Sequence, residues 1–173
     1  MSVMKTERTL HREWSPAPTL MTVMMWGVVG MMIYAIVIDP ADSPSAGLRT
    51  LAISSVAGFV ALIWALLFGL TVRVQETRIA LHLGRTPLVR TVVPFADIVS
   101  VRVIRYRPLV EFGGWGVRGS RQRRAWTARG NRAVEVTLIG DRVLLIGSDH
   151  PQRLENAILT HGGPGITRTA GRA

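Results

Sequence analysis

The chain has 173 residues, no cysteine and a formal net charge of +10. This length accommodates a membrane anchor and one small domain of about 100 residues, but no second globular core. The absence of cysteine excludes disulfides, thiolate metal ligands and a cysteine nucleophile.

The charge is confined to one part of the chain. Basic and acidic residues cancel in residues 1–72, whereas residues 73–173 hold seventeen arginines against seven acidic residues. Lys5 is the sole lysine, so arginine supplies nearly all of the positive charge. Two explanations of this bias stay open: the base composition of the genome, and recognition of an anionic partner. A basic domain next to a membrane favours anionic lipid headgroups, an acidic protein or nucleic acid as partners.

Two charge-free apolar runs, residues 19–38 and 50–72, come first in the chain. Helices of this length span roughly 30 Å, the thickness of the hydrocarbon core of a bilayer. The polar segment 39–49 between them contains two prolines, which predicts the tip of a transmembrane hairpin. The first run exceeds the apolar region of a signal peptide, and no A-x-A site follows it closely, so we expect it to be retained.

Basic residues flank the hairpin on the side of the two termini, and only Arg49 lies in the connection. The positive-inside rule therefore predicts a multi-pass protein of the cytoplasmic (inner) membrane with both termini in the cytoplasm. Residues 1–18 are expected to be a cytoplasmic N-terminal segment. No charged residue lies within either run, which argues against transport by this chain alone.

Small residues recur in the second run at helical spacing, and such residues let helices approach closely in lipid. They are Ser54, Ala57, Gly58, Ala61 and Ala65. The first run offers Gly27 and Gly30. We expect these faces to pack the hairpin on itself, with packing between protomers of a homo-oligomer as the alternative. Methionines cluster in the first run, and without cysteine or histidine in either run they predict apolar filling, not copper binding.

Beyond residue 72 the apolar residues alternate with polar ones, which is typical of strands. Seven strands are expected, near residues 72–75, 79–83, 88–93, 98–104, 125–128, 133–138 and 142–146. A helix is predicted over 149–159, since Asp149 is a candidate N-cap and Pro151 lies in the first turn. The fold class is therefore membrane α+β: a hairpin, then a small sandwich or partly open barrel with a closing helix at 73–161, and a disordered tail at 162–173.

Three stretches carry a family resemblance: residues 106–118 (YRPLVEFGGWGVR), residues 129–134 (RGNRAV), and residues 146–148 (IGS) with Pro151 and Leu154. With the preceding hairpin, this arrangement resembles the bacterial pleckstrin-homology-like (PH-like) membrane proteins. The resemblance covers about residues 72–160 and implies a seven-stranded fold with a closing helix at the membrane surface. It implies no ligand, because a fold does not determine a function.

Nine arginines lie between residues 102 and 132, against the single acidic residue Glu111. The planar guanidinium group matches phosphate, and aromatic side chains nearby add apolar surface. The candidate residues for binding lipid or a partner are Arg107, Trp115, Arg118, Arg121, Arg123, Arg124, Arg129 and Arg132. The alternative is a solvated basic loop that serves only as a topology signal.

Catalytic motifs are weak. Residues 114–119 match G-x-G-x-x-G, but the following residues lack the apolar stripe of the helix that a dinucleotide site needs. The histidines, His11, His82, His150 and His161, are scattered, and no G-x-S-x-G or H-E-x-x-H motif occurs. We therefore expect a non-enzymatic protein without cofactor or metal.

The expected function is binding of anionic lipid headgroups or a protein partner at the inner leaflet. The alternative is an accessory or assembly subunit of a larger membrane enzyme or transporter, with a membrane protein as its partner. Nucleic acid is disfavoured, because neither a recognition helix nor an aromatic nucleic-acid motif occurs.

Overall fold

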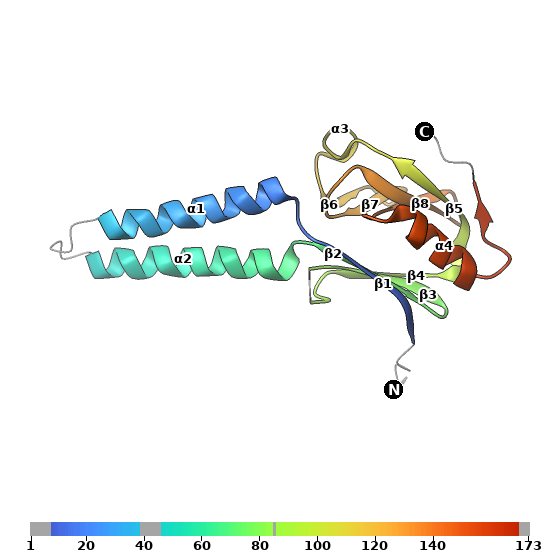
Figure 1. The fold of residues 1–173 in the computed structure, drawn as a ribbon, viewed down its shortest axis with the longest axis horizontal. Helices are drawn as coiled ribbons and strands as arrows, with labels where there is room; N and C mark the ends of the chain where they lie inside the picture. Colours follow the sequence, from blue (N-terminus) through green and yellow to red (C-terminus); the bar gives the residue numbers. More distant parts are fainter. Residues whose placement is uncertain (1–7, 39–45, 85, 170–173) are drawn as a thin grey trace.

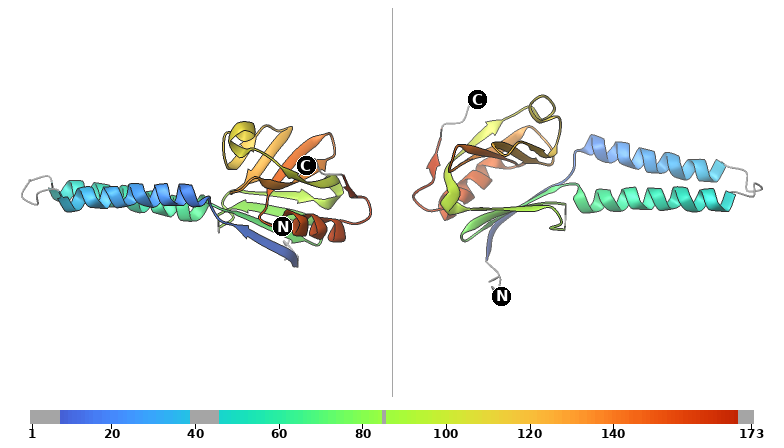
Figure 2. Two further views of the ribbon diagram at one scale, coloured as in Figure 1. Left: turned by 45° about the horizontal axis from the view of Figure 1, so that its top comes forward. Right: turned by 180° about the vertical axis from the view of Figure 1, so that it is seen from behind.

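The computed structural model of the protein describes residues 8–38, 46–84 and 86–169. The protein is α+β, with a helical hairpin, two β-sheets and two further α-helices within these residues. Figure 1 shows the hairpin projecting from one end of the β domain, and the other views agree (Figure 2).

The hairpin consists of α1 (Thr19–Ile38) and α2 (Ala46–Leu67), which lie side by side. Their contact buries Met25 and Val29 of α1 against Ala57 of α2. Three more residues of the same faces are partly buried there: Met32, Val60 and Trp64. Spacings of three and four residues place each set on one helix face, so the helices meet along continuous apolar stripes.

The predicted contact of small residues within the hairpin forms only in part, and packing between protomers stays a prediction. Of the proposed residues Ala57 is buried and Ala61 is half-buried, but Ser54 and Gly58 are exposed, and the side chain of Ala65 lies outside the described part. A Cβ atom added to Gly27 or Gly30 would meet nothing within 4 Å. Methionine side chains fill the space between the helices, so close approach of the backbones is not required.

Only one described helix has the length and composition for a membrane span. Residues Gly47–Trp64 of α2 have a mean hydropathy of 1.6, and 6% of this stretch is buried. The apolar part of α1, Thr19–Ala35, is shorter. The two-span prediction is therefore supported for α2 alone.

The boundary between α2 and the β domain differs from the prediction. The helix ends at Leu67, and β2 (Leu70–Gln75) begins three residues later, so the second apolar run is a helix followed by a strand. Leu70 and Val72 are at most 1% exposed. Hydropathy does not separate a lipid-facing helix from a buried strand, which explains the error. Gly69, with φ +116°, makes the turn between them.

The first sheet has four antiparallel strands in the order β1-β2-β3-β4. It consists of β1 (Thr9–Ser15), β2, β3 (Arg78–Leu83) and β4 (Arg90–Pro94). Strand β1 comes from the N-terminal segment that was predicted to lie outside the domain. The polar sequence of β1 gave no strand pattern, because an edge strand that pairs with a single neighbour needs few apolar residues.

The second sheet has six strands in the order β10-β5-β8-β9-β7-β6. The short 3-10 helix η1 (Phe95–Asp97) leads from the first sheet into it. In chain order its strands are β5 (Ile98–Arg105), β6 (Gly116–Gly119), β7 (Arg123–Thr127), β8 (Arg132–Leu138), β9 (Arg142–Gly147) and β10 (Thr167–Arg168). The described residues thus form ten strands in place of the predicted seven, with β1, β6 and β10 unforeseen.

The predicted disorder from residue 162 onward is wrong for residues 162–169. Strand β10 pairs in parallel with β5, and Ile166 is buried in the main core. Residues 170–173 lie outside the described part. One apolar side chain within a glycine-rich segment was too weak a signal to predict this strand.

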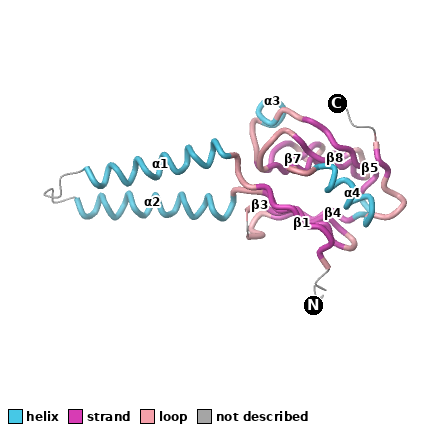
Figure 3. Tube along the Cα trace, in the orientation of Figure 1, coloured by secondary structure: helices cyan, strands magenta, loops and turns pink. Residues whose placement is uncertain are grey.

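Helix α4 (Pro151–His161) lies over both sheets and contacts β5, β8, β1 and β2 (Figure 3). Leu154 and Ile158 are fully buried in the core between the sheets, which confirms the predicted closing helix. A short helix, α3 (Pro108–Phe112), covers a smaller apolar cluster that includes Tyr106 and Leu145.

Candidate functional site

The glycine-rich segment after α3 positions Trp115. Gly113 ends α3 in the left-handed conformation with φ +68°, and Gly114 and Gly116 have φ values of +123° and +112°. Residues with a Cβ atom rarely adopt these angles, so the glycines direct the chain through this turn. The indole N–H of Trp115 donates to the carbonyl oxygen of Gly130 at 3.0 Å, which holds the ring in place.

Trp115 lines a pocket of about 360 Å³ where the hairpin meets the β domain, here called the junction pocket. Its walls come from the ends of both helices and from β3, β6 and β7. They include Pro18, Met21, Phe68, Leu83, Trp115 and Arg118. Two of the predicted binding residues, Trp115 and Arg118, are thus found together at the base of the hairpin. Arg118 is exposed and its Nε lies 3.5 Å from the carbonyl oxygen of Trp115.

Other predicted residues take part in contacts within the domain. Arg123 pairs with Glu111 at 3.3 Å and lies over the ring of Phe112, 5.3 Å from its centroid. The backbone N–H of Arg107 donates to the same carboxylate at 2.8 Å. These contacts tie α3 to β7.

Arg129 forms a two-pronged ion pair with Asp149. Its Nη2 lies 2.7 Å from one carboxylate oxygen, and its Nε lies 3.1 Å from both. These hydrogen bonds raise the pKa of the Arg129 guanidinium. The pair links the end of β7 to the start of α4, so the Arg129 guanidinium is already paired with a carboxylate of the domain.

Arg121 and Arg124 lie elsewhere, in a hollow of about 380 Å³ that Arg142 and Asp97 also line. Arg132 is exposed at the start of β8, opposite Arg105 of β5. The predicted cluster is therefore divided among several places, because alternation along the strands and the turn between β6 and β7 direct its members differently.

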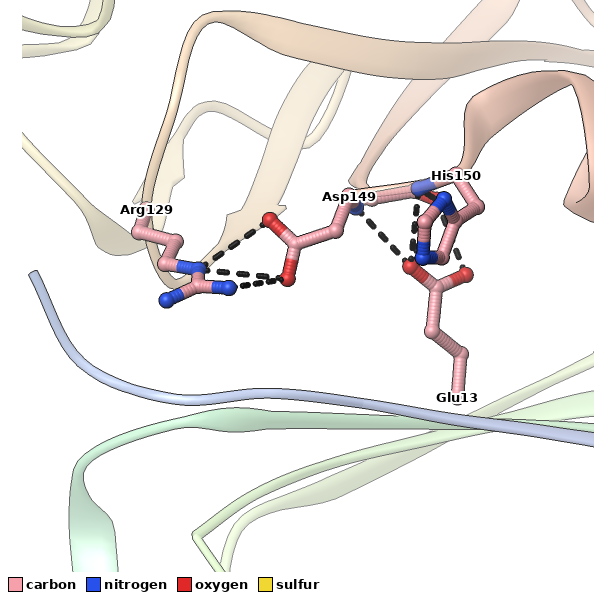
Figure 4. A network of polar contacts seen from close by, with 5 residues as sticks. Glu13, Arg129, Asp149 and His150 are labelled. Atoms are coloured by element: carbon pink, nitrogen blue, oxygen red, sulfur yellow. Dashed lines mark hydrogen bonds and ion pairs between the residues drawn. The ribbon is translucent and has the colours of Figure 1, made fainter.

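A buried polar network that sequence reasoning missed lies around Glu13 of β1, which is only 9% exposed (Figure 4). Its carboxylate accepts hydrogen bonds from the Ser148 hydroxyl and the Asp149 N–H, both at 2.8 Å, and from the His150 N–H at 3.3 Å. The donors precede α4, so the carboxylate lies at the positive end of this helix. Nothing in the sequence relates residues so far apart.

This network does not assemble a nucleophile. His150 contributes its backbone N–H, not its imidazole, and the Ser148 hydroxyl donates directly to the carboxylate. Within the described residues no group of three His, Asp or Glu side chains is placed to hold a metal ion. Residues 116–119 of the G-x-G-x-x-G match form strand β6, and the next element is strand β7, not a helix.

Comparison with models of protein families gives no match, and no curated protein matches the chain.

Proposed function

We propose that this protein is a non-enzymatic, membrane-anchored module whose PH-like domain binds anionic lipid headgroups at the inner leaflet. In this proposal α1 and α2 both cross the membrane, and both termini lie in the cytoplasm. The junction pocket, with Trp115 and Arg118 beside the ends of the helices, is the observation that carries the proposal.

The short connections between the hairpin and the domain support it. Three residues, 16–18, join β1 to α1, and Phe68 and Gly69 alone join α2 to β2. Two neighbouring strands thus continue directly from the two helices. A domain attached in this way stays at the membrane surface, with little freedom to move away from it.

Aromatic side chains gather at the same level. Trp64 stacks on Phe68 near the end of α2, with ring centroids 3.8 Å apart, and Trp115 lines the pocket beside Phe68. Tryptophan is enriched at the boundary between hydrocarbon and headgroups. In this proposal the apolar walls of the junction pocket lie at acyl-chain depth and the Arg118 guanidinium lies at the level of the lipid phosphates.

The test measures lipid retained by the full chain in mild detergent, using native mass spectrometry with phosphatidylglycerol and phosphatidylcholine. We expect a preference for phosphatidylglycerol that Arg118→Gln reduces about fivefold, the effect of losing one arginine near anionic lipid. Trp115→Leu should weaken retention of both lipids, because the ring forms part of the apolar wall.

Arg124→Gln is the matched control. It removes the same charge from the same β6–β7 pair, but Arg124 lines the separate hollow with Arg121 and Arg142 and not the junction pocket. Retention should stay at the wild-type level in this variant. Equal loss in the two variants would contradict the junction pocket as the site, and absence of any preference for phosphatidylglycerol would contradict the function.

A further inference from the structure

The face of the four-stranded sheet that points away from the core carries a row of polar side chains. The strand register aligns Thr71 of β2 with His82 of β3, and His82 with Arg90 of β4. In the next row Arg73 lies opposite Ala80. Leu81 and Ile79, which alternate with these residues on β3, are fully buried in the core, so His82 and Ala80 occupy the outer face.

A hollow of about 450 Å³ lies on this face, here called the outer hollow. Its lining includes Arg73, Arg78, His82, Pro87 and Arg90, and no Asp or Glu is among the described residues that line it. The methyl side chain of Ala80 leaves space between the longer side chains of neighbouring strands. Arg73 and Arg90 therefore place positive charge around an open volume whose described lining contains no carboxylate.

Several polar groups in the outer hollow lack partners. His82 is only 5% exposed, and its ring nitrogens make no well-formed hydrogen bond, although backbone groups of Leu83 and Gly84 lie near the ring. The Nε atom of Arg73 is also buried without an acceptor. Within the described residues Arg90 has no carboxylate partner. Most buried polar side-chain atoms in folded proteins are hydrogen-bonded, so these donors are available to an acceptor that enters the outer hollow.

We propose that the outer hollow binds the phosphate group of a small phosphorylated ligand, with Arg73 and Arg90 as the cationic partners and the His82 ring as a further donor. Two guanidinium groups and an imidazole offer more donors than a single carboxylate accepts, whereas a phosphate monoester has three terminal oxygens. The volume exceeds that of one phosphate, so the ligand carries further atoms.

The phosphate belongs either to a soluble molecule or to a lipid headgroup. Thr71, in the same row as His82, lies two residues after Gly69 at the end of the hairpin. A headgroup beside the hairpin is thus one source. The inference goes beyond the proposed function and uses none of the residues of the junction pocket.

The test titrates inorganic phosphate into the full chain in phosphate-free detergent, with histidine labelled for NMR and sodium chloride at matched ionic strength. We expect a saturable shift of the His82 signals, assigned with His82→Gln, and no shift for His161, which is exposed at the end of α4. Arg90→Gln and Arg73→Gln should each weaken phosphate binding about tenfold. Because Arg90 is exposed, its variant is expected to fold.

Arg153→Gln is the matched control, since it removes one exposed arginine outside the hollow. This variant should bind phosphate like the wild type. A His82 shift that does not saturate, or that chloride reproduces, would overturn the proposal, as would equal weakening in the control variant.

A second experiment uses nanodiscs in phosphate-free buffer to determine whether the phosphate belongs to a lipid or to a soluble ligand. Phosphatidic acid presents a phosphate monoester, whereas choline shields the phosphate of phosphatidylcholine. A His82 shift with phosphatidic acid alone assigns the site to a lipid, and a shift with free phosphate alone assigns it to a soluble ligand. Absence of a shift in both experiments overturns the site, while phosphatidylglycerol retention through Arg118 tests the proposed function separately.

Discussion

The carboxylate of Glu13 and the hydroxyl of Ser148 lie 2.8 Å apart although 135 positions separate them in the chain. This contact joins the first strand to the start of the closing helix. It places β1 within the cooperative unit of the β domain, so residues 8–18 contribute to its stability and are not merely a leader to the hairpin.

Glu13→Ala should lower the free energy of unfolding by about 3 kcal/mol, because it leaves the Ser148 hydroxyl and the Asp149 N–H without an acceptor, whereas the His150 N–H keeps the Ser148 oxygen at 3.0 Å. Glu13→Gln retains one acceptor oxygen and should lose less. Thermal unfolding of the full chain in mild detergent, followed by circular dichroism, measures the effect. Glu76→Gln, at an exposed position, should be neutral, and an equal loss there would refute the interpretation.

Gly69→Ala should destabilise the protein by about 2–4 kcal/mol. Gly69 has φ +116°, and an added Cβ would overlap the ring of Trp14. Gly27→Ala is the matched control, because a Cβ there meets no atom within 4 Å and lies within a helix. The melting temperatures of the two variants in one detergent test the prediction, and similar values would contradict it.

Burial lowers the pKa of the His82 imidazole below 6.5, and the charges of Arg73 and Arg12 act in the same direction. Backbone groups of Leu83 and Gly84 oppose the shift only in part. The unfolded chain therefore binds the proton first as the pH falls. The free energy of unfolding should decrease below about pH 6.5, as the unfolded imidazole titrates, until the folded imidazole is protonated as well.

Denaturant unfolding of the full chain at pH 7.5 and pH 5 measures this dependence. His82→Gln should reduce the difference in the free energy of unfolding between the two pH values, whereas His161→Gln should leave this difference unchanged. If the wild type and His82→Gln show the same pH dependence, His82 is not its source. Phosphate should be absent from the buffer, since an anion in the outer hollow would raise the pKa of His82.

The proposed orientation is tested with single cysteines, because the chain contains none. A cysteine replacing Ser45, which lies outside the described residues, should react with an impermeant reagent from outside intact cells. A cysteine replacing Ser120 in the exposed turn between β6 and β7 should react only after the cells are opened. The opposite pattern would reverse the topology.

Local patterns in the sequence predicted the elements that depend on them. The alternation in β8 and β9 predicted two strands, and the structure pairs them as antiparallel neighbours. The helix predicted over 149–159 is α4, and its Leu154 and Ile158 are buried in the core. In each case the residues that make the element also make its main contact with the core, so the sequence of the segment was sufficient.

Tertiary structure decided what depends on residues distant in the chain. An apolar run cannot distinguish the end of α2 from the start of β2, because lipid and a protein core both accept apolar side chains. Strand β1 carries polar residues whose partners come from the other end of the chain.

The candidate sites likewise depend in part on the sequence and in part on the tertiary structure. The sequence supplied an excess of arginine, but strand alternation and turns determined that Arg118 lies at the hairpin while Arg129 is paired with Asp149. The outer hollow depends on three strands in register, with Arg73, His82 and Arg90 each contributed by a different one. By itself the sequence determined local periodicity and net charge; which charges remain unpaired is a property of strand pairing, since it depends on residues that only the fold brings together.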